Sequence, residues 1–415
     1  MPVLGPLEAF LVGYALVVVL SSRRVKVYLS LLAMIVVFGL LALTPGAVGR
    51  SVVELGEWNN LRVFVYIFFS MLLAGVMREQ GRLEGLVEST SMAGCRFSLL
   101  SVPALIGLMP MPGGALVSAI ALRRKYFEEA RLSREDATYL NYWFRHVWVP
   151  VWPLFQSVVI TAAVLGVGPL DIVSHTWPAS VGAIIGGLAV AYYILSRVEC
   201  PRHEGEGGAR LFLWSFWPLL LLALLFVAVK TVPALRRLPG FNADPMLASL
   251  IVVAATTLAS KPLPLGKLRR ALSLAVRPTI HLVLLESLLL KDMVVNSGAG
   301  AETARLVSTG LIPGLALVFA IPFILGLAAG GENFFASTAI PLLTGIIGVG
   351  ARVDWWPLTV AYTGGYLGVM MSPIHLCLAL TVEYYESRLL PVLAKVLVSV
   401  VITALVGLAL ARIIL

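Results

Sequence analysis

The sequence predicts an all-α polytopic membrane protein built from two inverted repeats, and three observations support this fold class. The chain is 59% hydrophobic and 13% charged, whereas soluble domains average roughly 45–50% apolar and about 25% charged residues. Its charged residues cluster between apolar segments long enough to cross a hydrocarbon core about 30 Å thick. Related motifs also recur in the same order in the two halves of the chain.

The apolar segments predict ten transmembrane helices, five in each half of the chain. The first segment has no basic residue before it and no small-residue cleavage site, so we expect a retained helix rather than a signal peptide. The predicted spans are residues 3–20, 27–43, 61–77, 138–165, 172–195, 211–230, 244–260, 278–296, 355–382 and 390–413.

Two further apolar regions, residues 97–122 and 311–343, each contain a glycine-rich break. In the first, LMPMPGGALVSAIAL places prolines and glycines where they interrupt a helix. Division at the break leaves arms of about 12 residues, or roughly 18 Å, which reach the middle of the membrane and return. We therefore predict one re-entrant hairpin in each half.

Basic residues predict the orientation of this layout. Most lysines and arginines, including Arg123, Arg124 and Lys125, fall in loops on one side of the predicted membrane. Because cytoplasmic loops carry the excess of basic residues, we expect both termini outside the cell and a multi-pass protein in the plasma membrane of a prokaryote. The net charge of +9 fits such loops, and we expect no nucleic-acid partner.

The two hairpin regions align with each other at an offset of 219 residues, and their flanks align at nearly the same offset. An odd number of crossings per repeat places the second copy upside down, as in many secondary transporters. We predict inverted repeats at residues 1–196 and 211–415, joined by a linker at 197–210. The aligned pairs include Pro103 with Pro322, Gly107 with Gly326, Ser118 with Ser337, Tyr142 with Tyr362 and Pro153 with Pro373.

The first hairpin predicts one wall of a binding site. Broken helices persist in hydrocarbon only where protein or a water-filled cavity lines them. The amides that begin the second arm, after Gly114, suit an anion, although small residues can also serve only close helix packing. The substrate-binding candidates in this repeat are Pro112, Gly113, Gly114, Ser118, Asn141 and Arg145.

The second hairpin places Glu332 at the matching break. A carboxylate at this depth costs at least about 2.5 kcal/mol unless it is paired or hydrated. Glu332 could bind a coupling proton or cation, cap the second arm, or pair with Arg145. The substrate-binding candidates in this repeat are Gly330, Gly331, Asn333, Ser337, Thr338, Thr363, Gly364 and Gly365.

Arg145 belongs to the motif NYWFRHVW and lies about nine residues beyond Asp136, hence roughly 13 Å into the membrane. Its guanidinium suits a carboxylate or phosphate group. The structural alternative is a buried pair with a carboxylate. The next residue, His146, could relay protons or simply be hydrogen-bonded. The coupling-ion candidates are Glu332, Glu286, Asp292 and His146.

No enzyme motif and no Cys/His metal cluster is evident in the sequence. The cysteines, Cys95, Cys200 and Cys377, are widely spaced, and their odd number argues against a disulfide framework. We therefore expect neither an enzyme nor a metal site, and no cofactor other than a possible coupling Na⁺ or H⁺.

The pattern PxLIGLxPMPGGAL, followed by NYWFRHxW and WPL, resembles the prokaryotic integral membrane family grouped as domain of unknown function 401. That family is placed in the ion transporter superfamily with gluconate, citrate, dicarboxylate and arsenite carriers. The resemblance covers nearly the whole chain and implies ten spans, two hairpins, a homodimer and a transport domain that moves as an elevator. Val149 and Pro150 stand where relatives carry an acidic residue, and the sodium motif of dicarboxylate carriers is absent, so those roles are not carried over.

These observations predict a secondary active transporter, a permease that moves a small anionic organic solute by symport with H⁺ or Na⁺. The alternative is a cation/proton antiporter without an organic substrate, in which carboxylates bind the ions and Arg145 is structural. A membrane-embedded enzyme using His146 and a carboxylate is a third possibility, and it predicts turnover without a gradient.

Overall fold

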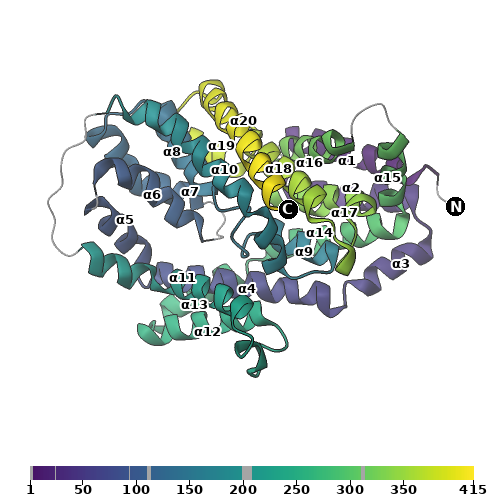
Figure 1. Cartoon of the computed structure of the whole chain (residues 1–415), viewed down its shortest axis with the longest axis horizontal. Coiled ribbons are helices and arrows are strands. Elements are labelled where there is room, and N and C mark those ends of the chain that lie inside the picture. Colours follow the sequence, from purple (N-terminus) through teal and green to yellow (C-terminus); the bar gives the residue numbers. More distant parts are fainter. Residues whose placement is uncertain (1–2, 24, 93, 110–113, 199–207, 310–313) are drawn as a thin grey trace.

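The computed structural model of the chain consists of helices joined by short connections (Figure 1). It describes residues 3–23, 25–92, 94–109, 114–198, 208–309 and 314–415, and none of these residues forms a strand. The prediction of an all-α fold is therefore confirmed.

Ten α-helices make up the first half of the described chain, with one short π-helical turn. They are α1 (Pro6–Ser22), α2 (Val27–Ala42), α3 (Pro45–Glu54), α4 (Trp58–Glu79), α5 (Arg82–Met92), α6 (Cys95–Gly107), α7 (Gly114–Arg124), η1 (Lys125–Glu129), α8 (Arg134–His146), α9 (Gln156–Leu165) and α10 (Pro169–Leu195).

The second half repeats this succession of long and short α-helices, with two short 3₁₀ turns. They are α11 (Gly208–Thr231), η2 (Leu235–Arg237), α12 (Pro245–Ser260), α13 (Leu265–Ala275), α14 (Pro278–Ser297), α15 (Ala299–Thr309), α16 (Gly314–Ala329), α17 (Glu332–Ile347), η3 (Gly350–Arg352), α18 (Trp355–Met371), α19 (Leu376–Tyr385) and α20 (Leu389–Ile414).

Six helical segments of the described chain are long and apolar enough to cross a membrane. Shorter apolar helices occupy other predicted spans, among them Tyr28–Ala42 and Pro245–Ser260. These segments support a multi-pass membrane protein. The six are Asn60–Glu79, Pro169–Leu195, Gly208–Thr231, Leu265–Ser297, Trp355–Tyr385 and Leu389–Ile414.

Two predicted spans differ from the structure because each is broken near its middle. The span predicted at residues 138–165 consists of α8 and α9, separated by an irregular stretch that contains Pro150 and Pro153. The span predicted at residues 355–382 breaks between α18 and α19, next to Pro373. A proline lacks the backbone N–H that a continuous helix needs and disfavours helical geometry in the residue before it.

Each predicted hairpin region contains two helices that correspond to its predicted arms. Helices α6 and α7 occupy the first region and contact each other, as do α16 and α17 in the second. The first arm of each region contains an internal proline, Pro103 or Pro322. With the two broken spans, the fold therefore contains four places where helices end inside the protein.

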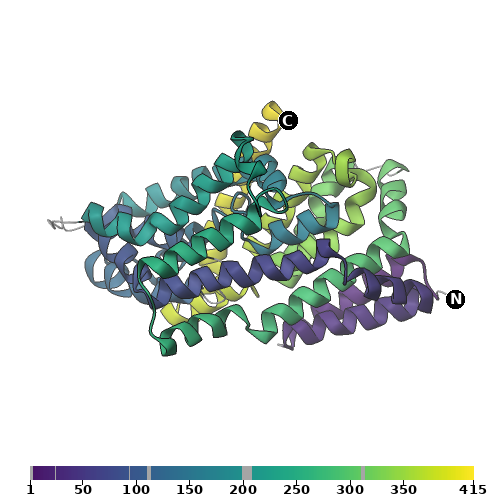
Figure 2. The same cartoon turned by 90° about the horizontal axis from the view of Figure 1, so that it is seen from below.

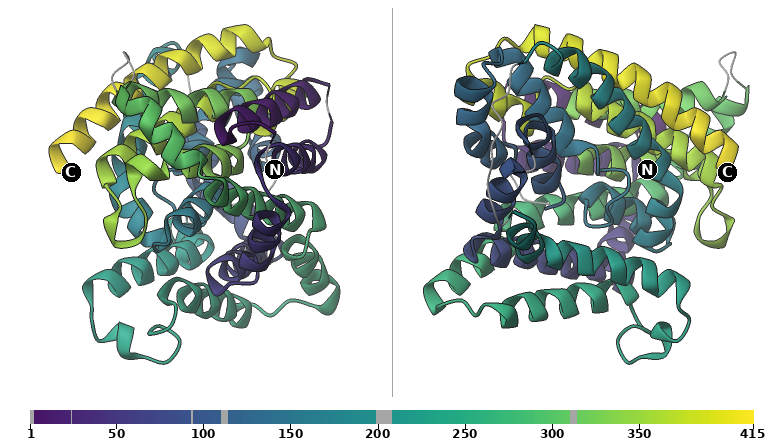
Figure 3. Two further views of the ribbon diagram at one scale, coloured as in Figure 1. Left: turned by 90° about the vertical axis from the view of Figure 1, so that its right-hand side faces the viewer. Right: turned by 60° about the vertical axis from the view of Figure 1, so that its left-hand side comes forward.

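Helix contacts recur in matching pairs across the two halves. Helix α4 packs against α12 and α13, while α14 packs against α2 and α3 (Figure 2). Likewise, α7 contacts α19 and α9 contacts α17, so each hairpin meets the broken span of the other half. In Figure 3, α11 and α12 lie along one side of the molecule.

Helices α10 and α20 cross closely, and α8 packs against both of them. Gly182 and Gly186 leave no room for a Cβ because backbone oxygens of α20 approach them directly. Tyr139 Oη lies 2.5 Å from Ser399 Oγ, and Trp143 Nε1 donates to the Ala183 carbonyl over 2.9 Å. These contacts fix α8, whose last residues form the candidate site.

Candidate functional site

Arg145 is buried at the end of α8 and extends between the two arms of the first hairpin. Its Nη1 donates to the Ile106 carbonyl over 3.0 Å. Gly107 and Gly114 create the space: a Cβ at Gly107 would overlap the Arg145 carbonyl, and one at Gly114 would overlap the guanidinium. The structure thus places Arg145 against Gly107 and Gly114, on either side of the first glycine-rich break, near which the sequence predicted it.

This position explains how a guanidinium is tolerated in the interior. The last carbonyls of α6 have no intrahelical partners and carry the negative end of the helix dipole. Arg145 meets that end, so its charge is partly balanced without an acidic partner on the same hairpin. The first residue of α7, Gly114, lies against the other side of the guanidinium.

Asn141, one turn before Arg145, connects the first hairpin to the second half of the chain. Its Nδ2 donates to the Ala115 carbonyl over 2.9 Å and to Thr381 Oγ1 of α19 over 3.3 Å. Its Oδ1 is buried and has no partner within the described chain. Asn141 therefore keeps one acceptor available at the junction of three helices.

The tip of the second hairpin lies at the start of α17. Gly330 has a φ of +66°, a left-handed conformation that favours glycine. Gly331 occupies the N-cap position, and no side chain caps the helix there. Glu332 is the first helical residue, is only partly buried, and lies within hydrogen-bonding reach of Ser157. The structure therefore gives Glu332 no capping bond and directs it toward α9.

Ser157 connects Glu332 to a group of buried tyrosines. Its Oγ lies 2.8 Å from the Tyr362 hydroxyl, which also lies 3.3 Å from the Val149 carbonyl. Tyr142, Tyr362 and Tyr366 all lie near Glu332, as does Arg145. Residues from both hairpins and both broken spans therefore surround one polar centre.

Two histidines and a cysteine lie beside Arg145 in this centre. The rings of His146 and His375 are 5.0 Å apart between centroids. Cys377, at the start of α19, lies within hydrogen-bonding reach of both His146 and Arg145. Sequence reasoning selected His146 but missed His375 and Cys377. The available signal was HLC at residues 375–377, which begins two residues after Pro373, where the span breaks.

Several buried polar atoms of this region have no hydrogen-bond partner within the described chain. Native proteins leave few such atoms, so each indicates a place for water or a ligand. They include Asn141 Oδ1, Thr363 Oγ1, Tyr366 Oη, Ser372 Oγ and His375 Nε2.

The predicted hairpin hydroxyls are satisfied within their own helices. Ser118 Oγ donates to the Ala115 carbonyl over 3.1 Å, and Ser337 Oγ donates to the Asn333 carbonyl over 2.8 Å. Thr338 likewise donates to the Phe334 carbonyl. These hydroxyls keep their acceptor lone pairs but need no external partner.

Gly364 and Gly365 serve close helix packing in the structure. A Cβ at Gly364 would overlap the Phe319 carbonyl, and one at Gly365 would overlap the Phe335 ring. Pro112 and Gly113 lie outside the described residues.

The remaining acidic candidates lie on α14. Asp292 forms an ion pair with Lys291 at 2.6 Å and accepts a hydrogen bond from Asn60 over 3.1 Å. Glu286 is buried, and its Oε2 has no partner within the described chain. Asp292 is thus engaged by neighbouring side chains, whereas Glu286 keeps a bonding position open.

The cysteines differ from the prediction. Cys95 is disulfide-bonded and Cys377 is a free thiol. Cys95 is therefore not the bystander that its isolated position in the sequence suggested, although one bridge is not a disulfide framework. An odd number of cysteines excludes complete pairing but not a single bridge.

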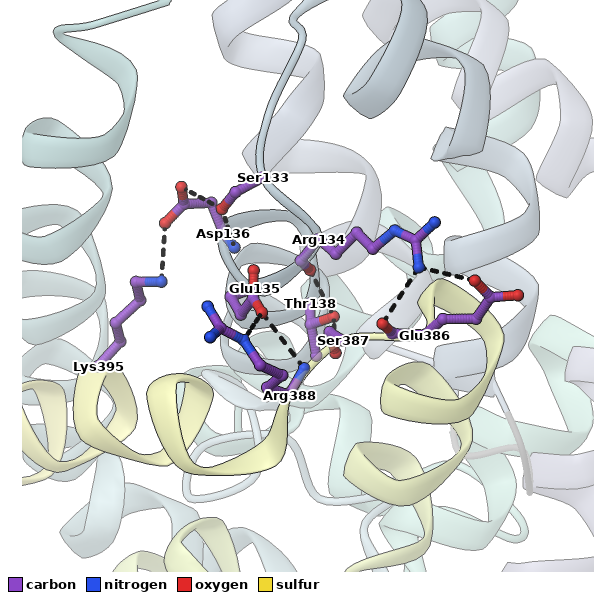
Figure 4. A network of polar contacts seen from close by, with 9 residues as sticks. All are labelled: Ser133, Arg134, Glu135, Asp136, Thr138, Glu386, Ser387, Arg388 and Lys395. Atoms are coloured by element: carbon purple, nitrogen blue, oxygen red, sulfur yellow. Dashed lines mark hydrogen bonds and ion pairs between the residues drawn. The ribbon is translucent and has the colours of Figure 1, made fainter.

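The start of α8 is fixed to the second half by surface charges (Figure 4). Arg134 Nη1 lies 2.7 Å from Glu386 Oε2, Arg388 Nε lies 2.8 Å from Glu135 Oε1, and Lys395 Nζ lies 2.9 Å from Asp136 Oδ1. The hydrogen bond from Arg388 lowers the pKa of the Glu135 carboxyl. Three ion pairs therefore position the helix that carries Arg145.

The fold and this centre define an all-helical, multi-pass membrane protein with charged groups buried where its helices break. The chain belongs to the family described as protein of unknown function (DUF401), which it matches over residues 7–414. No curated protein matches the chain.

Proposed function

We propose that the protein is a secondary active transporter of a small anionic organic solute. The observation that carries this proposal is the placement of Arg145, whose buried guanidinium lies between the arms of the first hairpin and beside the start of α7. A guanidinium and helix-start amides suit a carboxylate or phosphate group. The unpartnered polar atoms nearby provide further bonds for a solute.

The matched contacts support an arrangement of two inverted repeats, with five spans and one hairpin in each. Gly107 packs on the carbonyl of Arg145, and the aligned Gly326 packs on the carbonyl of Gly365. The same alignment therefore predicts an equivalent contact in each half. Two such halves can exchange conformations, which is the usual basis of alternating access.

We also propose an elevator in which one bundle carries the site. Helices α6 to α10 and α16 to α20 would form this bundle, and the contacts of α17 with α14 and α15 would have to slide as it moves. The other long helices, α4, α11 and α14, would form the static part, which we expect to hold a homodimer in the plasma membrane. Both termini would lie outside the cell, so that the basic loops remain in the cytoplasm.

Glu332 is our candidate for coupling to H⁺ or Na⁺. Its carboxylate and the Ser157 hydroxyl supply oxygen ligands of the kind that hard cations prefer. The same position favours a second candidate function, cation/proton antiport without an organic solute. In that case Glu332 binds the ion and Arg145 only supports the hairpin.

A binding experiment tests the role of Arg145. Purified protein would be screened by thermal shift against small mono-, di- and tricarboxylates and inorganic phosphate. We expect Arg145→Gln to weaken the binding of the best anion at least about tenfold, because it removes a charge-assisted hydrogen bond. Arg62→Gln, at a partly exposed position on α4, is the matched control. Unchanged anion-dependent stabilisation in Arg145→Gln would contradict the proposal.

A flux experiment separates the two candidate functions. Proteoliposomes would be given an imposed pH or sodium gradient, with and without the best anion from the screen. Symport predicts that both Arg145→Gln and Glu332→Gln stop gradient-driven anion uptake. Cation flux that needs Glu332 but neither Arg145 nor the anion would instead establish antiport.

A further inference from the structure

His146, His375 and Cys377 bring three metal-binding side chains together at the centre of the fold. One nitrogen of each imidazole and the Cys377 sulfur all lie within 4.8 Å of one another. His146 comes from the end of α8, whereas His375 and Cys377 flank the start of α19. Residues far apart in the sequence thus meet at the break in each of two spans.

The hydrogen bonds of both histidines fix which nitrogen remains for a ligand. His146 Nδ1 lies 2.7 Å from the Tyr142 carbonyl, and His375 Nδ1 lies 2.9 Å from the Gly330 carbonyl. A carbonyl oxygen only accepts hydrogen bonds, so each Nδ1 carries the proton. Each Nε2 therefore keeps its lone pair. Metal-binding histidines in proteins show the same pattern, with the other ring nitrogen donating to a carbonyl or carboxylate.

The free nitrogen of His375 lacks a partner among the described residues in the absence of a ligand. The residue is 6% exposed, and its Nε2 has no hydrogen-bond partner within the described chain. A buried acceptor without a donor costs free energy comparable to a lost hydrogen bond. A bound cation would satisfy this lone pair and would replace the Cys377 thiol as the neighbour of the free nitrogen of His146.

We propose that His146, His375 and Cys377 bind a borderline-soft divalent metal ion of the Zn²⁺ type. Imidazole nitrogen and thiolate sulfur are the ligands that Zn²⁺ prefers. Zinc–ligand bonds of about 2.0–2.3 Å place tetrahedral donors roughly 3.5 Å apart, so small side-chain rotations would close the site. Three protein ligands leave one tetrahedral position open, as in metal sites that bind an exchangeable ligand.

The charges around this cluster are compatible with a bound cation. The Cys377 thiolate would balance one positive charge, and the Glu332 carboxyl group lies nearby. Arg145 lies within hydrogen-bonding reach of the Cys377 sulfur, and its positive charge opposes the binding of a cation. Arg145 and the open position would together favour an anion as the fourth ligand. The metal site itself does not depend on the transport proposal.

Cobalt spectroscopy of the purified, tag-free protein tests this site without measuring transport. Co²⁺ bound by a thiolate gives a charge-transfer band in the near ultraviolet and strong visible bands when tetrahedral. We expect both in the wild-type protein, and we expect Zn²⁺ to displace Co²⁺. Zn²⁺ should also slow the alkylation of Cys377 by a maleimide. Absence of the thiolate band, or an alkylation rate unchanged by Zn²⁺, would overturn the proposal, and neither readout needs a variant.

Substitutions then locate the ion. Cys377→Ser should abolish the charge-transfer band, and His375→Gln should weaken Co²⁺ binding at least about 100-fold, because even outer-shell changes cost about 10- to 100-fold in affinity. The control is His175→Gln, since His175 stacks on Trp355 away from the cluster, with centroids 3.9 Å apart. A band that persists in Cys377→Ser would place the ion elsewhere and overturn the assignment.

Discussion

Gly107 lies directly against the backbone carbonyl of Arg145, and its counterpart Gly326 lies against the backbone carbonyl of Gly365. In both places a helix of the hairpin region approaches a broken span so closely that only glycine fits. The first of these contacts brings the end of α6 to the last turn of α8, which contains Arg145. Two equivalent glycines thus hold the hairpin regions on the helices that carry the candidate site.

Alanine at either glycine should destabilise the fold. A Cβ at Gly326 would lie 2.6 Å from the Gly365 oxygen, and one at Gly107 would be closer still to its carbonyl. We expect Gly107→Ala and Gly326→Ala to lower stability by about 1–3 kcal/mol each, as in other overpacked interiors, measured by denaturation in detergent. Gly49→Ala on α3, where a Cβ meets nothing within 4 Å, is the control. Wild-type stability in both variants would contradict the packing described here.

Gly114→Ala should affect binding rather than folding. The new Cβ would overlap the guanidinium of Arg145, which is the mobile end of a long side chain and can move aside. We therefore expect near-normal thermal unfolding but at least about tenfold weaker binding of an anion that Arg145 holds. Parallel titrations of Gly114→Ala and Arg145→Gln check this, because a common cause predicts no additional loss in the double variant.

Removal of Asp292 should destabilise the protein more than it alters coupling. Asp292 and Lys291 are buried together with Asn60, which bonds to both side chains. Loss of one partner from a buried pair typically costs about 3–5 kcal/mol, because the other charge stays buried alone. We expect Asp292→Ala to show this loss in detergent unfolding and Lys291→Met/Asp292→Leu to recover most of it. A stable Asp292→Ala variant with altered ion dependence would favour the coupling role instead.

The helical class and the position of Arg145 were predictable because they follow from local patterns. Apolar length predicts spans, and glycine with proline predicts breaks, so the nearness of Arg145 to the first break could be counted along its helix. Pro150, Pro153 and Pro373 were visible too. Their apolar flanks nevertheless favoured continuous spans, because hydropathy does not register a break inside an apolar segment.

The cluster of His146, His375 and Cys377 could not be predicted in the same way. Its members come from two spans more than two hundred residues apart, and only tertiary contacts between the halves join them. Their spacing in the sequence matches no metal motif, because His146 ends α8 whereas His375 precedes α19. The sequence repeat offered no signal either, because the position aligned with His375 at an offset of 220 is Phe155.

The ion pair of Glu135 and Arg388 predicts a stability that depends on pH. Arg388 Nε donates to Glu135 over 2.8 Å and favours the charged carboxylate, so the pKa of Glu135 in the folded protein is below its usual value of about 4.3. The folded protein therefore binds this proton less readily than the unfolded chain. The stabilisation is fully present above the usual glutamate pKa and is lost as the pH falls through the lowered pKa.

Arg388→Gln should reduce the thermal midpoint at pH 7 and leave it unchanged at the acid end. The exposed Arg352 provides the control substitution, and low ionic strength limits screening. A difference between wild type and Arg388→Gln that stays constant with pH would show that Arg388 acts through packing rather than through Glu135.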